Sequence, residues 1–299
     1  MINGICPIIA TPFREDGQVD EESFRRIVRY VLRAGAHGVV FPAVASEFYA
    51  LSEGERKRFS EVMIDEVHGS VPVIVGTSAS STAIAVDLSR HAEKIGADAV
   101  MLMAPYVVKE RSTVIQEHFG KVAEAVDLPI IMQNSPAFLG SAQSTEDVLQ
   151  LLNQLPQIRY VKEENLPCGQ RITRLLGEAP TSLLGVFGGA GGRYLIDEIN
   201  RGAIGAMPAC ELTEIHTAIF NHFAKGDRAG ARNLYNRSLP LLNLQAVFRM
   251  SMTKAVLYHR GIIEDTRVRA GGILLDEFDQ NELKLMLGEV EDLLLPETT

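Results

Sequence analysis

Eight short apolar segments recur along the chain at intervals of roughly 20 to 35 residues. They cover residues 5–13, 38–44, 71–77, 99–105, 129–134, 158–163, 182–188 and 203–209. Each segment is too short for a helix and too uniformly apolar for a strand that has one face in water. Such segments are typical of parallel strands that other elements cover on both faces. We therefore expect eight buried parallel strands.

Amphipathic segments separate these apolar ones. Residues 20–36, for example, place Phe24, Ile27, Val28, Val31 and Leu32 on one helical stripe. Ser52 and Ser144 are each followed three residues later by an acid, which is a signal for the start of a helix. Strand and helix thus alternate eight times, which predicts an α/β chain folded as a (β/α)8 TIM barrel. A doubly wound open sheet is the alternative, but no GxGxxG motif follows the first strand to favour its dinucleotide-binding form.

The strand pattern stops after about residue 210. Helical periodicity then continues to Leu295, through residues 214–227, 230–250, 251–261 and 280–294. We therefore predict a barrel over residues 1–223 and a C-terminal helical extension over residues 224–299. Such an extension often serves the assembly of a barrel protein.

Composition excludes several classes of partner. The net charge is −9 and no cluster of Lys and Arg occurs, which argues against a nucleic-acid or anionic-membrane surface. Three widely spaced cysteines without a CxxC pair suggest neither a disulfide framework nor a zinc site. Pro7 and Pro12 interrupt an N-terminal segment that has no basic leader, so a first strand is expected there rather than a signal peptide. A cytoplasmic location without membrane spans fits these features.

Lys162 is the candidate for chemistry, because reactive groups in such barrels come from the carboxyl ends of the strands. It lies in the segment IRYVKEEN, residues 158–165, and is the only lysine at those eight ends. Alternation along a strand places Tyr160, Lys162 and Glu164 on one face and Glu163 on the other. A lysine in a dry cavity can form a Schiff base with a ketone. A purely structural ion pair with Glu163 or Glu164 is the alternative.

Five motifs carry a resemblance to a known family. They are PIIATPF followed by DGQVD, then ASEFYALSEGER, VIVGTSASSTAIAVDLSRHAEKIGADAVMLMAPY, QNSP and VKEEN. Over essentially its whole length the chain resembles the dihydrodipicolinate synthase and N-acetylneuraminate lyase superfamily of class I Schiff-base lyases.

The resemblance implies specific roles for individual residues. It places the Schiff-base lysine at Lys162 and a loop that holds the substrate carboxylate through backbone amides at residues 43–47. The substrate-binding residues that follow from it are Ala45, Ser46, Glu47, Gly189 and Met207, with Gly189 as a close wall beside the substrate. It further implies a 2-keto acid substrate, no cofactor or metal, and a homotetramer.

The chain also departs from the family pattern. The usual G-T-T-G-E after the second strand is Ala43 to Glu47 here, so the first threonine is Val44. The tyrosine at the end of the fifth strand is Gln133, and the second tyrosine of P-Y-Y is Val107. The arginine that synthases use for their second substrate would lie near Phe138. We therefore do not expect a dihydrodipicolinate synthase.

The motifs S-E, Q-[DN]-x-P and K-x-E instead resemble the L-2-keto-3-deoxyarabonate dehydratase branch. Two alternatives stay open. One is a pyruvate-dependent aldolase, and the other is a non-catalytic keto-acid binding protein that kept the barrel and lost the hydroxyl relay.

Other side chains would have to carry the protons. Glu164 is the nearest titratable group, with burial expected to raise its pKa and an iminium charge expected to lower it. Gln133 can donate to a substrate oxygen or hold a water, and Ser46 can bind the keto-acid carboxylate. Each residue also has a purely structural alternative. Glu164 could be a charge partner for the lysine, Gln133 a cap at the strand end and Ser46 a cap of the following turn.

Three further features have weaker interpretations. The glycines of residues 188–192 follow the seventh strand, where some barrels bind phosphate, although a wall of the substrate site is favoured. His91 and His216 lie in helical patterns and are expected to be core or surface residues. No spacing of His and carboxylates suggests a metal site.

Overall fold

The computed structural model describes residues 1–136 and 141–296 and has eight parallel strands in one sheet. The strands are β1 (Gly4–Ile5), β2 (Val39–Phe41), β3 (Val73–Gly76), β4 (Ala99–Leu102), β5 (Ile130–Asn134), β6 (Ile158–Glu163), β7 (Gly185–Gly188) and β8 (Gly205–Ala206). Their order is β1-β8-β7-β6-β5-β4-β3-β2. A parallel bridge from Ile8 to Val40, with the Ile9 N–H donating to the Val40 carbonyl at 2.9 Å, joins the two ends. The predicted (β/α)8 barrel is confirmed, and each strand falls within its predicted segment except β1, which begins one residue earlier, at Gly4.

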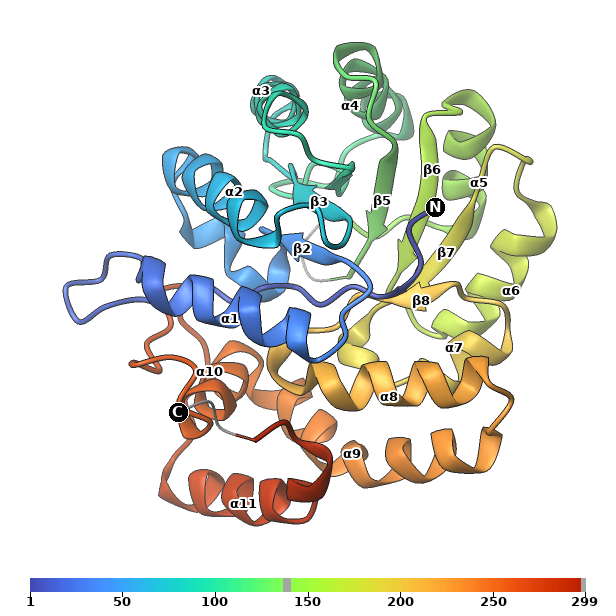
Figure 1. The fold of residues 1–299 in the computed structure, drawn as a ribbon. Helices are drawn as coiled ribbons and strands as arrows, with labels where there is room; N and C mark the ends of the chain where they lie inside the picture. The colour runs from blue at the N-terminus through green and yellow to red at the C-terminus, as the bar shows by residue number, and fades with distance from the viewer. Residues whose placement is uncertain (137–140, 297–299) are drawn as a thin grey trace.

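Eight helices surround this sheet (Figure 1). They are α1 (Glu21–Arg33), α2 (Glu53–Val67), α3 (Thr82–Lys94), α4 (Ser112–Ala125), α5 (Thr145–Gln154), α6 (Cys168–Glu178), α7 (Leu195–Asn200) and α8 (Thr213–Ala224). The predicted start signals are confirmed. The Ser52 hydroxyl accepts from the Glu55 N–H at 3.2 Å, and the Ser144 hydroxyl accepts from the Asp147 N–H at 3.1 Å.

Apolar side chains fill the barrel interior. Ile8, Met101, Tyr160 and Phe187 belong to one buried cluster there. The N-terminal segment crosses the amino end of the barrel near its centre (Figure 1), where the Ile2 N–H donates to the Tyr160 hydroxyl at 3.2 Å. Because this end is closed by packed side chains, chemistry is left to the carboxyl ends of the strands.

Three helices follow the barrel: α9 (Arg228–Phe248), α10 (Met250–His259) and α11 (Glu277–Gly288). They gather on one side, next to α8 and α1 (Figure 1). Leu241, Met252 and Leu287 from these helices share an apolar cluster with Leu195 of α7 and Ile219 of α8. The predicted domain boundary at residues 223 and 224 falls at the end of α8, and the division into two domains stays a prediction.

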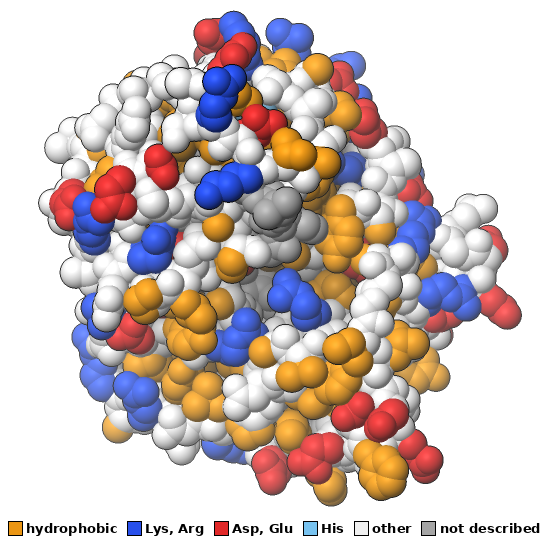
Figure 2. All heavy atoms as spheres, turned by 180° about the vertical axis from the view of Figure 1, so that it is seen from behind, with side chains coloured by type: hydrophobic (Ala, Val, Ile, Leu, Met, Phe, Trp, Pro, Cys, Tyr) orange, Lys and Arg blue, Asp and Glu red, His pale blue; other side chains and the backbone are white. Residues whose placement is uncertain are grey.

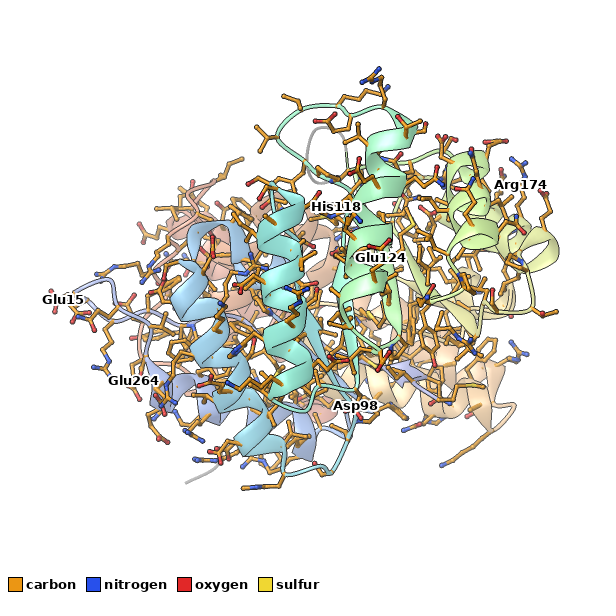
Figure 3. The ribbon with its side chains drawn as sticks, turned by 90° about the horizontal axis from the view of Figure 1, so that it is seen from above. Glu15, Asp98, His118, Glu124, Arg174 and Glu264 are labelled. Carbon is orange, nitrogen blue, oxygen red and sulfur yellow. The ribbon has the colours of Figure 1, made fainter. Side chains whose placement is uncertain are left out.

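Charged side chains cover the outside of the helical ring. Arg174 and Glu124 lie on this outer surface, whereas His118 lies between α3 and α4 (Figure 3). His118 is buried, and its Nδ1 lies 3.1 Å from the Thr82 hydroxyl of α3. Among the helices of the described part of the chain, none is both long and apolar enough to cross a bilayer.

Candidate active site

A cavity of about 480 Å³ opens at the carboxyl ends of the strands. Its lining comes from the segments after β2, β5, β6, β7 and β8 and from the junction of α9 and α10. Figure 2 shows this face, where Lys and Arg side chains in blue stand around the hollowed centre. The volume suits a small organic substrate rather than a macromolecule.

Lys162 lies in this cavity at the end of β6. It pairs in register with Gln133 of β5 and Phe187 of β7, and it is 2% exposed. Glu163 points to the opposite side of the strand, where its carboxylate accepts from Asn134 at 2.8 Å and lies 3.2 Å from Arg171 Nε. The alternation expected along this strand is therefore present.

Glu164 is the ion-pair partner of Lys162. Its Oε1 lies 3.1 Å from Lys162 Nζ and accepts from Gln133 Nε2 at 2.8 Å, while its Oε2 accepts from the Ser135 hydroxyl at 3.1 Å. Burial raises the pKa of Glu164, but the charge of Lys162 and these hydrogen bonds outweigh burial, so the pKa lies below 4.5. Glu164 is thus a carboxylate poised to accept a proton, and the rise toward neutral pH that burial alone predicts does not occur.

The backbone of Gly189 packs closely against the Glu164 side chain. A Cβ atom at Gly189 would stand 2.3 Å from Glu164 Cγ and 2.9 Å from its Cδ. Only a glycine lets the loop after β7 come this close. Gly189 therefore forms a wall against the carboxylate, and Met207 after β8 lines the cavity directly.

The polar side chains of the loop after β2 are bonded away from the cavity. Val44 and Ala45 line the cavity. The Ser46 hydroxyl is buried, donates to the Ile9 carbonyl at 2.5 Å and accepts from the Ala43 N–H at 3.1 Å. This is the turn cap that was the alternative for Ser46.

Glu47 also points away from the cavity. Its Oε1 lies 2.5 Å from Lys254 Nζ of α10, and its Oε2 accepts from the Ala270 N–H at 2.8 Å. Both charged side chains are completely buried. Glu47 therefore connects the loop to the C-terminal extension. Its role in this structure is structural, and it does not contact the cavity.

Lys162 is thus buried at a strand end, lies beside the Glu164 carboxylate and faces a cavity that the loop after β2 also lines. This arrangement suits imine chemistry with a keto acid. The sequence profile of the Dihydrodipicolinate synthetase family matches residues 1–289. The chain belongs to this family. Its members are enzymes of the class I aldolase and lyase type.

Relatives in the family support this placement. The chain is 34% identical over 248 residues to a 4-hydroxy-tetrahydrodipicolinate synthase of Methanopyrus kandleri, with 80% of each chain covered. It is 32% identical over 253 residues to the enzyme of the same name from Syntrophobacter fumaroxidans, covering 81% of this chain and 82% of that one. The crystal structure of dihydrodipicolinate synthase from Rhodopseudomonas palustris matches with a TM-score of 0.87 and 28% identity, covering 96% and 97% of the two chains.

The positions that differ from the family pattern can now be placed. Val44 and Gln133 line the cavity, whereas Val107 is 62% exposed and is not part of its lining. Tyr106 packs edge-on against Phe48, with ring centroids 5.7 Å apart. Phe138 lies outside the described residues.

The cavity also contains residues that sequence reasoning missed. They are Tyr49, Ser135, Arg193, Tyr194, Gln245 and Arg249. Arg193 and Tyr194 follow the seventh strand, so the rule that site residues follow strand ends could have found them. Arg249 stands between two helices of the C-terminal extension, and no local signal connects that segment with the barrel.

The weaker sequence features lie outside this chemistry. The N–H groups of Gly192 and Arg193 donate to the Gly189 and Ala190 carbonyls, so they are already used within the turn. His216 is buried in α8, and His91 lies 3.4 Å from Glu61. Within residues 1–136 and 141–296, no group of three or more His, Cys, Asp and Glu side chains is arranged to hold a metal ion.

Proposed function

We propose that the protein is a Schiff-base-forming lyase that dehydrates a small 2-keto-3-deoxy sugar acid. Within this class, the sequence motifs favour L-2-keto-3-deoxyarabonate, which would give 2-oxoglutarate semialdehyde. The observation that carries the proposal is the pair of the buried Lys162 and the partly buried Glu164, 3.1 Å apart in a cavity where Gln133 replaces the family tyrosine.

The first step joins the substrate to the lysine. The neutral amine of Lys162 attacks the C2 ketone, water leaves, and an iminium forms that draws electrons from C3. Glu164 can take the amine proton, because it is already a carboxylate at hydrogen-bonding distance, and it would return this proton to the carbinolamine hydroxyl as that group leaves as water. The substrate carboxylate would be bound by the loop at Val44 and Ala45.

The second step is elimination. Glu164 removes the C3 proton to give an enamine, and the same group, now protonated, helps the C4 hydroxyl to leave as water. Tautomerisation then yields the aldehyde at C5, and hydrolysis of the iminium frees Lys162. Gln133 donates a hydrogen bond to Glu164 at 2.8 Å and would hold it in position through both transfers.

Retro-aldol cleavage makes a different demand. It needs a base for the proton of the C4 hydroxyl, and the family relay of three hydroxyl groups is replaced by Val44, Gln133 and Val107. None of these side chains accepts a proton. The aldolase alternative is retained because curated relatives carry the name of a synthase.

The product decides between these reactions. Incubation with L-2-keto-3-deoxyarabonate should release 2-oxoglutarate semialdehyde, which a semialdehyde dehydrogenase assay detects, and no pyruvate. Stoichiometric pyruvate in a coupled lactate dehydrogenase assay would show an aldolase. An imine adduct without turnover of any C5 or C6 2-keto-3-deoxy acid would show a binding protein.

We also propose a homotetramer in the cytoplasm, in keeping with the family resemblance. Sedimentation velocity of the purified protein tests the assembly state, with a single species of four chains as the expected result. A stable monomer would contradict this part of the proposal.

A further inference from the structure

Two arginines stand in the cavity beside the reactive pair. Arg193 follows the turn after β7, and Arg249 lies at the junction of α9 and α10. Arg193 Nη1 donates to Gln245 Oε1 at 3.0 Å, which fixes the guanidinium against α9. Among the described residues, no carboxylate forms a salt bridge with either arginine.

The charges of this region are unbalanced. Lys162, Arg193 and Arg249 contribute three cationic groups to the lining, and Glu164 is the only acid among its described residues. Burial lowers the pKa of Arg193, and the positive charge of Arg249 lowers it further. Tyr194 and Glu164 act in the opposite direction, but the net effect is a lowered pKa. The two arginines are thus close enough to influence each other. Like charges that face one cavity without a counterion are typical of a site for an anion.

The backbone at Arg249 supports a functional reason for its presence. Its φ is +48° and its ψ is −117°, a conformation that glycine adopts readily and an L side chain does not. Strain of this kind persists where the surrounding structure imposes it, often at functional sites. A glycine would relieve the strain, but it would remove the cation from the cavity.

The first carboxylate of a keto acid has another place to bind. It is attached to C2, which Lys162 holds, and the backbone loop at Val44 and Ala45 faces the same cavity. The arginines come from other elements, the turn after β7 and the C-terminal helices. They are therefore available to a second group on the substrate.

We propose that Arg193 and Arg249 bind an anionic group at the end of the substrate that is distant from the keto carbon. A 2-keto-3-deoxy acid with a second terminal acid, a carboxylate or a phosphate, should then bind more tightly than the pentonate of the proposed function. This inference rests on the proposed function, because it concerns the same cavity, and it predicts which members of the substrate class bind more tightly.

Binding of matched keto acids tests the inference without requiring turnover. Calorimetry on the native protein compares 2-oxoadipate with 2-oxohexanoate, which has the same chain length and lacks the second acid. We expect Kd to be lower for the diacid by a factor of about 10 or more, the scale of one charge-assisted contact at a partly exposed site. The same measurement with 2-keto-3-deoxy-6-phosphogluconate shows whether a phosphate or a carboxylate is preferred as the second acid.

Three variants locate the effect. Arg249→Gly and Arg193→Met should each reduce the diacid preference to about threefold or less, and Arg249→Gly should not lower Tm, because glycine fits that backbone. Arg90→Met, on the exposed side of α3, removes the same charge at a distance and should leave the preference unchanged. Salt should weaken the preference in the native protein.

Two results would overturn the inference. One is that the native protein binds 2-oxohexanoate as tightly as it binds 2-oxoadipate and 2-keto-3-deoxy-6-phosphogluconate. The other is an equal loss of affinity for all of them in the arginine variants, which would assign the arginines to the first carboxylate. Failure of the proposed function is distinguishable, because Lys162→Ala should keep the diacid preference even if no substrate is ever dehydrated.

Discussion

Replacement of Glu164 by glutamine should separate imine formation from proton transfer. Glutamine has nearly the same shape and can still form hydrogen bonds with Gln133 and Ser135, but its amide cannot act as an acid or a base near neutral pH. The carboxylate stands 3.1 Å from Lys162 Nζ, within reach of atoms bonded to the imine carbon. We therefore expect kcat to fall by a factor of about 10² to 10⁴, with a smaller change in KM.

Steady-state kinetics with the preferred 2-keto-3-deoxy acid measures this effect. The Lys162 adduct should still form in Glu164→Gln after borohydride reduction, since the amine remains in place. Glu146→Gln provides a matched control, because Glu146 is exposed on α5 and its only ion pair among the described residues is with Arg174. A kcat of Glu164→Gln within about threefold of the native value would return Glu164 to a purely structural role.

Three further predictions concern the surroundings of this pair. Gly189→Ala should lower kcat at least about tenfold, because its Cβ would displace Glu164, whereas Gly177→Ala, with open space in α6, should raise stability by about 0.5–1 kcal/mol in thermal unfolding. Burial raises the pKa of Glu198 from 4.5 to about 8, so between these values only the folded state holds the proton. Stability should then fall as pH rises through this range, by up to about 1.4 kcal/mol per pH unit, and Tm of Glu198→Gln should vary less with pH. Gln133→Tyr should not create synthase activity, measured with pyruvate and aspartate semialdehyde, because the two other hydroxyl groups of the family relay remain absent.

Much of the fold follows from local sequence. The eight apolar segments become strands because their uniform apolar character suits burial on both faces of a barrel wall. The position of Lys162 follows from the alternation of side chains in β6, which also sends Glu163 toward Arg171. These features depend on neighbours in the chain, so sequence reasoning reached them.

Side-chain directions in the loops could not be predicted in this way. Glu47 has a φ of +57°, and this turn directs its carboxylate to Lys254, which is more than 200 residues away. Ser46 is turned to the Ile9 carbonyl by the same loop. Arg249 reaches the cavity because the helical extension folds back over the barrel, and such a contact between distant segments leaves no local pattern.

The central claim is that Lys162 forms the Schiff base. Borohydride added to the protein with pyruvate, followed by peptide mass mapping, tests it most directly, because only an imine is reduced to a stable adduct under these conditions. We predict one adduct per chain, on Lys162, and none in a Lys162→Ala variant that keeps its fold by circular dichroism. An adduct on a different lysine, or no adduct in the native protein, would contradict the account.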